Sequence, residues 1–190
     1  VWIYPAIPIP QKTERIYFPS LSGKNEITSV KINDIKITMA HLLLRETFDE
    51  FLLEESKVVT FAMFEINGKR NLNWYDDDEK ENQLSELLYW GEARDFLFDY
   101  IKGKKTPEYM KFSLKASHKA AEKILAESGV FSRYLSEQPD LYLQIRYEKG
   151  ELTMVTGITH REFTMDKTLD RGWDDAIREW IRTLKISVEV

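Results

Sequence analysis

The stretch "LYLQIRYEKGEL", residues 141–152, decides the fold class because it carries the pattern of a β-hairpin. Its apolar residues alternate with polar ones, as in a strand that has one buried face. Gly150 follows at the position where a hairpin with a bulge requires a positive φ. The returning strand is predicted to run from Leu152 to Met165 and to bend at Gly157.

The stretch "KVVTFAMFEI", residues 57–66, is rich in β-branched and aromatic residues on both faces. Such a run is typical of a central strand that is covered on both sides, so Phe61 and Phe64 are predicted to be buried. The dipeptide Asn67-Gly68 that follows predicts a tight turn. A return strand through residues 72–74 would complete this second hairpin.

Two further strands are expected, at residues 28–32 and 109–116. Four amphipathic helices are expected, at residues 33–44, 93–101, 118–128 and 173–184. Ser117 is the predicted N-cap of the third helix, and Gly129 is expected to end that helix. Hairpins with helices between them predict an α+β fold, in which about four helices pack on a largely antiparallel sheet.

The composition predicts one domain, at residues 27–190, preceded by a Pro-rich extension or arm at residues 1–26. Glycine and proline are scarce beyond the arm, and no apolar run is long enough to cross a bilayer. The arm begins "VWIYPAIPIP", whose prolines exclude a helix and whose apolar side chains favour contact with an apolar surface of this chain or a neighbour. A non-native leader remains the alternative interpretation of the arm.

From about residue 29 to residue 185 the chain resembles a family of small bacterial proteins that is known only as a domain of unknown function. Its motifs, quoted from this sequence, are "ETFDEFLLEE", "FEINGK", "IKGKKTPEYMKFSL", "LYLQIRYEKGEL" and "FTMDKTLDRGWD". The resemblance implies a compact cytoplasmic protein and carries over no reaction, cofactor or catalytic residue. The absence of cysteine is consistent with a reducing compartment.

Lys102, Lys104 and Lys105 form a short basic run, and Arg146 is a further cation on a predicted strand. Together they are the candidate contacts of a phosphate or a nucleic-acid backbone. The run also lies at the predicted C-terminal end of a helix, where lysines complement the helix dipole and need no functional explanation. Both interpretations remain open at this point.

The residues that could bind a metal or carry catalysis form no known motif. The acidic run of residues 76–79 lacks the spacing and the glycine of a calcium-binding loop. His41, His118 and His160 are far apart in the sequence and fit no zinc pattern. No P-loop, dinucleotide-binding glycine motif or nucleophile elbow is present, so we expect no metal site and no cofactor.

Two functional hypotheses follow. The preferred one is a non-enzymatic cytoplasmic binding or interaction protein, with self-association through the N-terminal arm or a free sheet edge. The alternative is an enzyme or a nucleic-acid-processing factor that uses the polyanion site around residues 102–105. Neither hypothesis involves a membrane partner.

The net charge of −5 predicts that the chain binds DNA or RNA weakly or not at all at physiological salt, because only one short basic run opposes the repulsion. A fluorescence anisotropy titration with labelled DNA and RNA measures this affinity. Submicromolar binding with a steep salt dependence, lost when Lys102, Lys104 and Lys105 are replaced by alanine, would contradict the prediction and support the alternative hypothesis.

Overall fold

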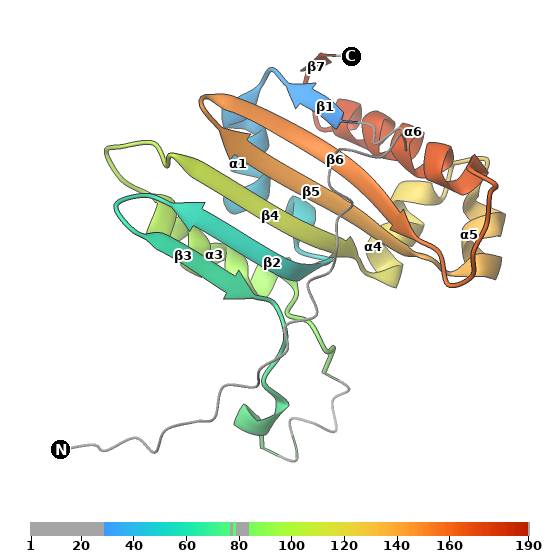
Figure 1. Ribbon diagram of the computed structural model, residues 1–190, viewed down its shortest axis with the longest axis horizontal. Helices are drawn as coiled ribbons and strands as arrows, with labels where there is room; N and C mark the ends of the chain where they lie inside the picture. The colour runs from blue at the N-terminus through green and yellow to red at the C-terminus, as the bar shows by residue number, and fades with distance from the viewer. Residues whose placement is uncertain (1–28, 77, 79–83, 190) are drawn as a thin grey trace.

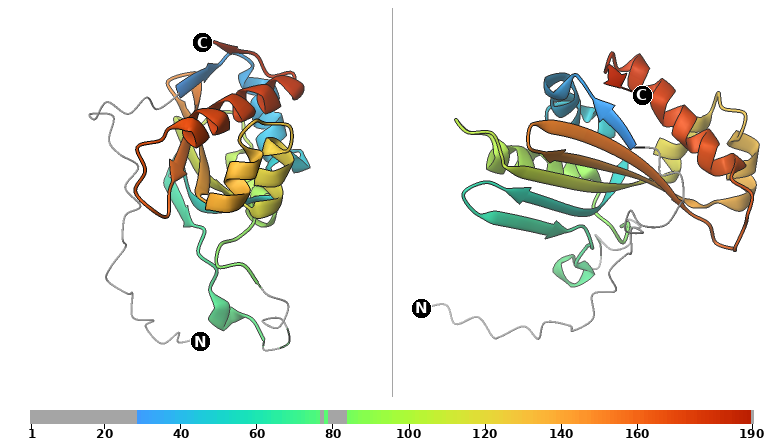
Figure 2. Two further views of the ribbon diagram at one scale, coloured as in Figure 1. Left: turned by 90° about the vertical axis from the view of Figure 1, so that its right-hand side faces the viewer. Right: turned by 45° about the horizontal axis from the view of Figure 1, so that its top comes forward.

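The computed structural model describes residues 29–76, 78 and 84–189 (Figure 1). Its strands form a seven-stranded antiparallel sheet in the order β3-β2-β4-β5-β6-β1-β7. The helices gather on one side of this sheet, as Figure 2 shows. The chain therefore has the α+β architecture that the sequence predicts, with two layers and one helix-covered sheet face.

The centre of the sheet is formed by β4 (Tyr109–Ala116), β5 (Asp140–Glu148) and β6 (Glu151–Thr159). β5 and β6 are joined by Lys149 and Gly150, which both have a positive φ, of 53° and 83°. The positive φ predicted for Gly150 is confirmed, but Glu148 pairs directly with Glu151, so the turn is a two-residue turn without the predicted bulge. The strand β6 ends at Thr159, earlier than the predicted Met165.

The prediction of one central strand over residues 57–66 is wrong. The segment is a hairpin, in which β2 (Phe51–Val59) turns into β3 (Met63–Asn67) at the end of the sheet. Phe61 lies at the tip of the turn and is 94% exposed. The tip is fixed from a distance: Thr60 Oγ1 donates a hydrogen bond to the hydroxyl of Tyr100, which donates to the carbonyl of Ala62 (both 3.1 Å).

The predicted turn at Asn67-Gly68 and the return strand at 72–74 are also wrong. Gly68 lies against β2, and a Cβ there would fall 1.6 Å from the carbonyl oxygen of Leu53. The glycine is needed for this close backbone approach and not for a turn. Leu72–Trp74 form the short 3-10 helix η2.

The sheet edge opposite β3 is formed by strands from both ends of the described chain. β1 (Ser29–Ile32) pairs with β6, and the two-residue strand β7 (Val188–Glu189) pairs with β1. The predicted domain boundary at residue 26 and the arm before it lie outside the described residues.

The helices and the remaining 3-10 helix are α1 (Ile35–Leu43), η1 (Glu46–Phe48), α3 (Trp90–Ile101), α4 (His118–Leu125), α5 (Phe131–Glu137) and α6 (Thr168–Thr183). Ser117 caps α4 as predicted, because its hydroxyl accepts a hydrogen bond from the N–H of Ala120 (3.2 Å). Helix α5 was not predicted, and α6 begins five residues before Trp173. Within the described residues, no helix has the length and apolar character that crossing a bilayer requires.

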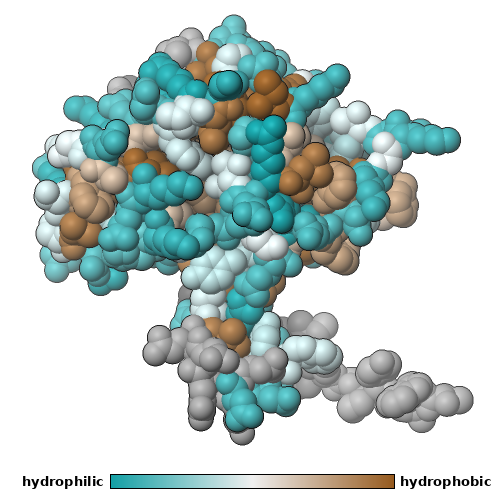
Figure 3. Space-filling view, turned by 180° about the vertical axis from the view of Figure 1, so that it is seen from behind, coloured by the Kyte–Doolittle hydropathy of each residue, from teal (hydrophilic) through white to brown (hydrophobic). Residues whose placement is uncertain are grey.

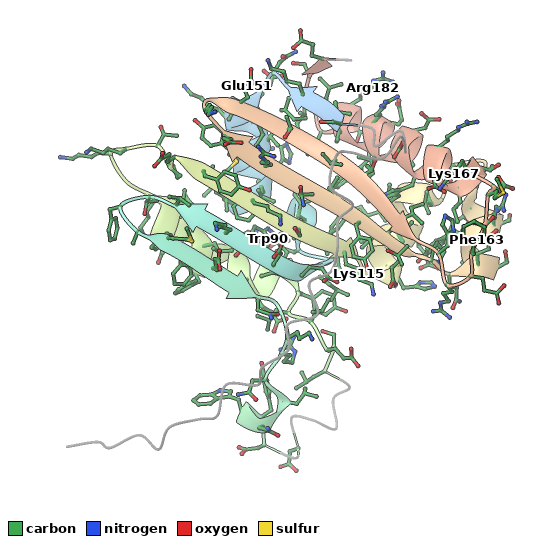
Figure 4. All side chains as sticks on the ribbon, in the orientation of Figure 1. Trp90, Lys115, Glu151, Phe163, Lys167 and Arg182 are labelled. Carbon is green, nitrogen blue, oxygen red and sulfur yellow. The ribbon has the colours of Figure 1, made fainter. Side chains whose placement is uncertain are left out.

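The core lies between the sheet and the helices and is built around two buried tryptophans. Trp90, labelled in Figure 4, packs edge-on against Phe112 of β4, with ring centroids 5.3 Å apart. Its indole N–H donates to the carbonyl of Leu42 (2.7 Å), and that of Trp173 donates to the carbonyl of Tyr142 (3.1 Å). Both rings thus fill the core and satisfy their only polar atom.

This packing predicts opposite effects for two phenylalanines. Phe112→Ala removes a fully buried ring and should lower the free energy of unfolding by about 3–5 kcal/mol. Phe61→Ala should change it by less than about 0.5 kcal/mol because the ring is exposed. Chemical denaturation of both variants provides the measurement. A loss of more than about 3 kcal/mol in the free energy of unfolding for Phe61→Ala would support the original prediction of a central strand.

Candidate functional site

The sheet face opposite the helices is polar, and its cations lie in ion pairs. The pairs are Lys31–Glu151, Lys57–Glu65 and Lys115–Asp140 (each 2.8 Å), together with Lys111–Glu55 and Arg146–Glu148. Most of them join residues of neighbouring strands. The charges on this face therefore compensate one another and do not form a basic surface.

The four residues predicted for a polyanion site are not assembled by any described contact. Arg146 pairs with Glu148 and lies 5.9 Å from the ring centre of Tyr109. Lys102 follows α3 and pairs with Asp99 (2.7 Å), whereas Lys104 and Lys105 are exposed in the loop before β4. The register of β4 and β5 places this loop and Arg146 at the same end of the sheet. Two of the four cations are thus already neutralised by carboxylates.

The three histidines have separate local partners. His41 is buried between Thr47 (2.8 Å) and Arg45 (3.0 Å), and burial lowers its pKa. His118 lies 3.4 Å from a glutamate one turn further along α4, and His160 lies 2.9 Å from Asp170. Across residues 29–76, 78 and 84–189, no group of three or more histidine, aspartate or glutamate side chains is arranged to hold a metal ion. Of the predicted acidic run, residues 77 and 79 lie outside the described part.

Two side chains of the polar face near a β-bulge in β2 have raised pKa values. Glu54 lies at this bulge, and burial raises its pKa, while nearby Lys115 partly opposes the increase. Burial, assisted by the charge of Asp140, raises the pKa of Tyr142 to about 12. Lys115, labelled in Figure 4, is the register partner of Tyr142 and is held by Asp140. Shifted pKa values of this kind occur in structural ion-pair networks as well as in active sites.

A groove of about 900 Å³ lies between α6 and the turn that joins α4 to α5. Apolar residues such as Val130, Ala176 and Trp180 line it together with charged side chains of both elements. Gly172 lets α6 approach this turn, because a Cβ there would fall 2.4 Å from a methyl group of Val130. The glycine therefore serves close packing between the two elements.

Four aromatic residues gather where the hairpin β2–β3 meets α3, and we call them the aromatic ledge: Phe61, Phe64, Phe96 and Tyr100. The ring centroids of Phe64 and Tyr100 are 4.9 Å apart, those of Phe64 and Phe96 5.5 Å, and those of Phe61 and Tyr100 6.3 Å. Phe96 is 56% exposed although it belongs to this cluster. Figure 3 shows brown and tan apolar surface on the side where α3 and β3 lie. The ledge is a contiguous apolar surface in contact with solvent.

A second exposed apolar site is the loop between β6 and α6, where Phe163 and Met165 are 95% and 85% exposed (Figure 4). Asp166 orders this loop by accepting hydrogen bonds from the N–H of Thr168 (2.9 Å) and from Arg133 (2.6 Å). The hydroxyl of Thr168, which also donates to Asp166 (2.6 Å), together with Arg133 and the Thr168 N–H, holds the pKa of Asp166 far below its ordinary value. The loop therefore presents two apolar side chains from a hydrogen-bonded frame.

Arg70 ties α3 to the chain that follows β3 and so supports the aromatic ledge. Its side chain is 3% exposed and donates two hydrogen bonds to Glu92, of 2.6 and 2.9 Å. It also donates to the carbonyl of Ser85 (2.9 Å) and to the hydroxyl of Tyr75 (2.8 Å). Glu92 in turn accepts from the N–H of Tyr89 at the start of α3 (2.8 Å), which fixes the first turn of the helix.

Exposed carboxylates lie on both elements that carry the aromatic ledge. Glu65 of β3 and Asp95 and Asp99 of α3 are all exposed, and Asp95 the most, at 87%. Arg94, which pairs with Asp95 and also with Asp49, is largely buried. We call Glu65, Asp95 and Asp99 the acidic rim, because each carboxylate is more exposed than the cation with which it pairs.

Sequence reasoning assigned Phe61 and Phe64 to the core and did not identify the ledge. The pattern of "FAMFEI" contains no glycine or asparagine at the turn, so nothing local marks the hairpin. The turn is stabilised by Tyr100, which lies forty residues away in the sequence. The amphipathic pattern of α3 was the one available signal, and it places Phe96 on the predicted buried side.

Residues 41–189 match the sequence profile of a family of unknown function, DUF5721. This match covers most of the sheet and every helix from α3 onward, and it confirms the resemblance seen in the sequence. The chain has no significant match among curated proteins. It has none among solved structures either.

The contact between Arg70 and Glu92 predicts a pH-dependent contribution to stability. Arg70 holds the pKa of Glu92 below its ordinary value, so the contribution is complete above about pH 4.3 and is lost as the pH falls through the lower, folded-state pKa. Glu92→Gln should reduce the free energy of unfolding at pH 7 by about 1–3 kcal/mol. Denaturation of wild type and variant across this range should show the difference shrinking in acid, and a constant difference would contradict the account.

Proposed function

Since this chain belongs to a family of unknown function, DUF5721, we propose its function from its surface: it is a non-enzymatic protein that binds a partner protein at the aromatic ledge and the adjacent edge of β3. The observation that carries the proposal is the exposure of Phe61 and Phe96 within a cluster of packed rings. Contiguous exposed apolar surface of this kind marks interaction sites in soluble proteins.

The ledge has the properties of an interface anchor. Burying an exposed aromatic side chain contributes roughly 1.5–3 kcal/mol, and interface energy concentrates in a few such residues. Tyr100 is fixed by its two hydrogen bonds to the hairpin tip, and Phe64 packs on it. A partner therefore meets rings that are already ordered, which reduces the entropy lost on binding.

The charged part of the surface gives less support to the alternative, an enzyme or nucleic-acid-processing factor. Binding of a polyanion depends on cations that are free to replace its counterions. Lys102 and Arg146 are engaged by Asp99 and Glu148, and the lysines of the polar face are engaged likewise. We retain the expectation that nucleic acid is not a partner.

Two further features belong to the same proposal. We propose that the protein acts in the cytoplasm of a bacterium, a proposal that rests on the sequence resemblance alone. Self-association is a weaker form of the same hypothesis, since β3 ends the sheet and could pair with a second copy. The N-terminal arm, the other candidate for self-association, falls outside the described residues.

Site-specific photo-crosslinking in cells tests the proposal. A photoreactive phenylalanine analogue at position 61 or 96 should give one discrete, light-dependent adduct with a partner protein, because both side chains lie on the binding surface. Position 163 is the matched control, since Phe163 is as exposed as Phe61 but lies on the loop before α6.

The same adduct from positions 61 and 96 but not from 163, identified by mass spectrometry, is the expected result. No adduct at either ledge position, or adducts only at position 163, would overturn the assignment of the ledge as the binding surface.

A further inference from the structure

We infer that the partner binds as an extended segment that adds a strand to the outer edge of β3, and that this segment is apolar on one face and basic on the other. The inference rests on the proposed function and names the chemistry of the partner. It is carried by the edge itself, by the side chains on its two sides and by the distribution of charge around it.

β3 is the terminal strand and pairs with β2 alone within the described residues. In an antiparallel strand every second residue directs its N–H and C=O away from the neighbour, so β3 has backbone groups available along its outer edge. Its five residues, Met63–Asn67, span roughly 16 Å, which is enough for a short added strand.

An added strand would place alternate side chains on the two faces of the sheet. Phe64 pairs with the buried Val58 and contacts Phe96 and Tyr100, so one row of partner side chains would meet the aromatic ledge. Glu65 lies on the other face, where it pairs with Lys57. The Glu65 side chain is 60% exposed and that of Lys57 35%, so the partner's second row would meet the carboxylate first, which favours basic side chains there.

The acidic rim favours a basic segment over a second copy of the chain as the occupant of the β3 edge. Two copies joined edge to edge through β3 about a two-fold axis would bring Glu65 of both copies to the same interface. Like charges placed together in this way oppose association, and the chain as a whole carries a net charge of −5. A basic segment gains from the same charges that repel a second copy.

The test uses fluorescence anisotropy with the full chain and labelled peptides. The first probe is an extended peptide of alternating valine and lysine, which can place valines on the ledge and lysines beside Glu65 on the other face of the sheet. Its counterpart of alternating valine and glutamate tests the charge, and a fully N-methylated form of the lysine peptide tests the backbone hydrogen bonds.

The lysine peptide should bind about tenfold more tightly than either control peptide. Phe96→Ala should weaken its binding by about tenfold, whereas Phe163→Ala, which removes an equally apolar side chain elsewhere, should leave it unchanged. Both positions are exposed, so neither substitution is expected to unfold the protein.

Equal binding of the three peptides, no binding of the lysine peptide, or binding that Phe96→Ala does not weaken would each overturn strand addition by a basic segment. These outcomes leave the proposed function standing if photo-crosslinking at positions 61 and 96 still captures a partner, because a folded partner could use the ledge alone. Loss of those adducts overturns the proposed function itself.

Discussion

The packing of Trp90 against Phe112 is the interaction on which the rest of this structure depends. Trp90 begins α3, and its ring fills the space between that helix and the central strand β4. Its N–H binds the carbonyl of Leu42, so α1 is held in the same arrangement. Because this contact fixes the start of α3 on the sheet, it also fixes where Phe96 and Tyr100 lie, one to three turns further along the helix.

The one-sided arrangement of the helices gives each surface a distinct character. The helix side buries the apolar layer, while the opposite face carries ion pairs that compensate one another. Apolar side chains remain exposed where α3 packs against the hairpin β2–β3. Binding chemistry is therefore concentrated at an edge of the sheet, where backbone groups and aromatic rings are available together.

The sequence predicted elements whose pattern depends on one buried face, and failed where contacts distant in the sequence decide the structure. β4 and the hairpin around Gly150 follow from strict alternation and one glycine. The hairpin tip at Phe61 depends on Tyr100 from α3, which no local pattern reveals. Of the candidate cations, Arg146 was placed correctly on a strand, but its neutralisation by Glu148 is visible only in the folded chain.

The central claim is that the outer edge of β3 is free in the unbound protein. Residue-resolved hydrogen exchange of the free chain measures this most directly. The account predicts alternation along residues 63–67: amides that face β2 exchange slowly, and amides that face outward exchange at rates typical of solvent-exposed groups. Slow exchange at every amide of β3 would contradict the claim, because it would mean that another part of the chain or a second copy already covers the edge.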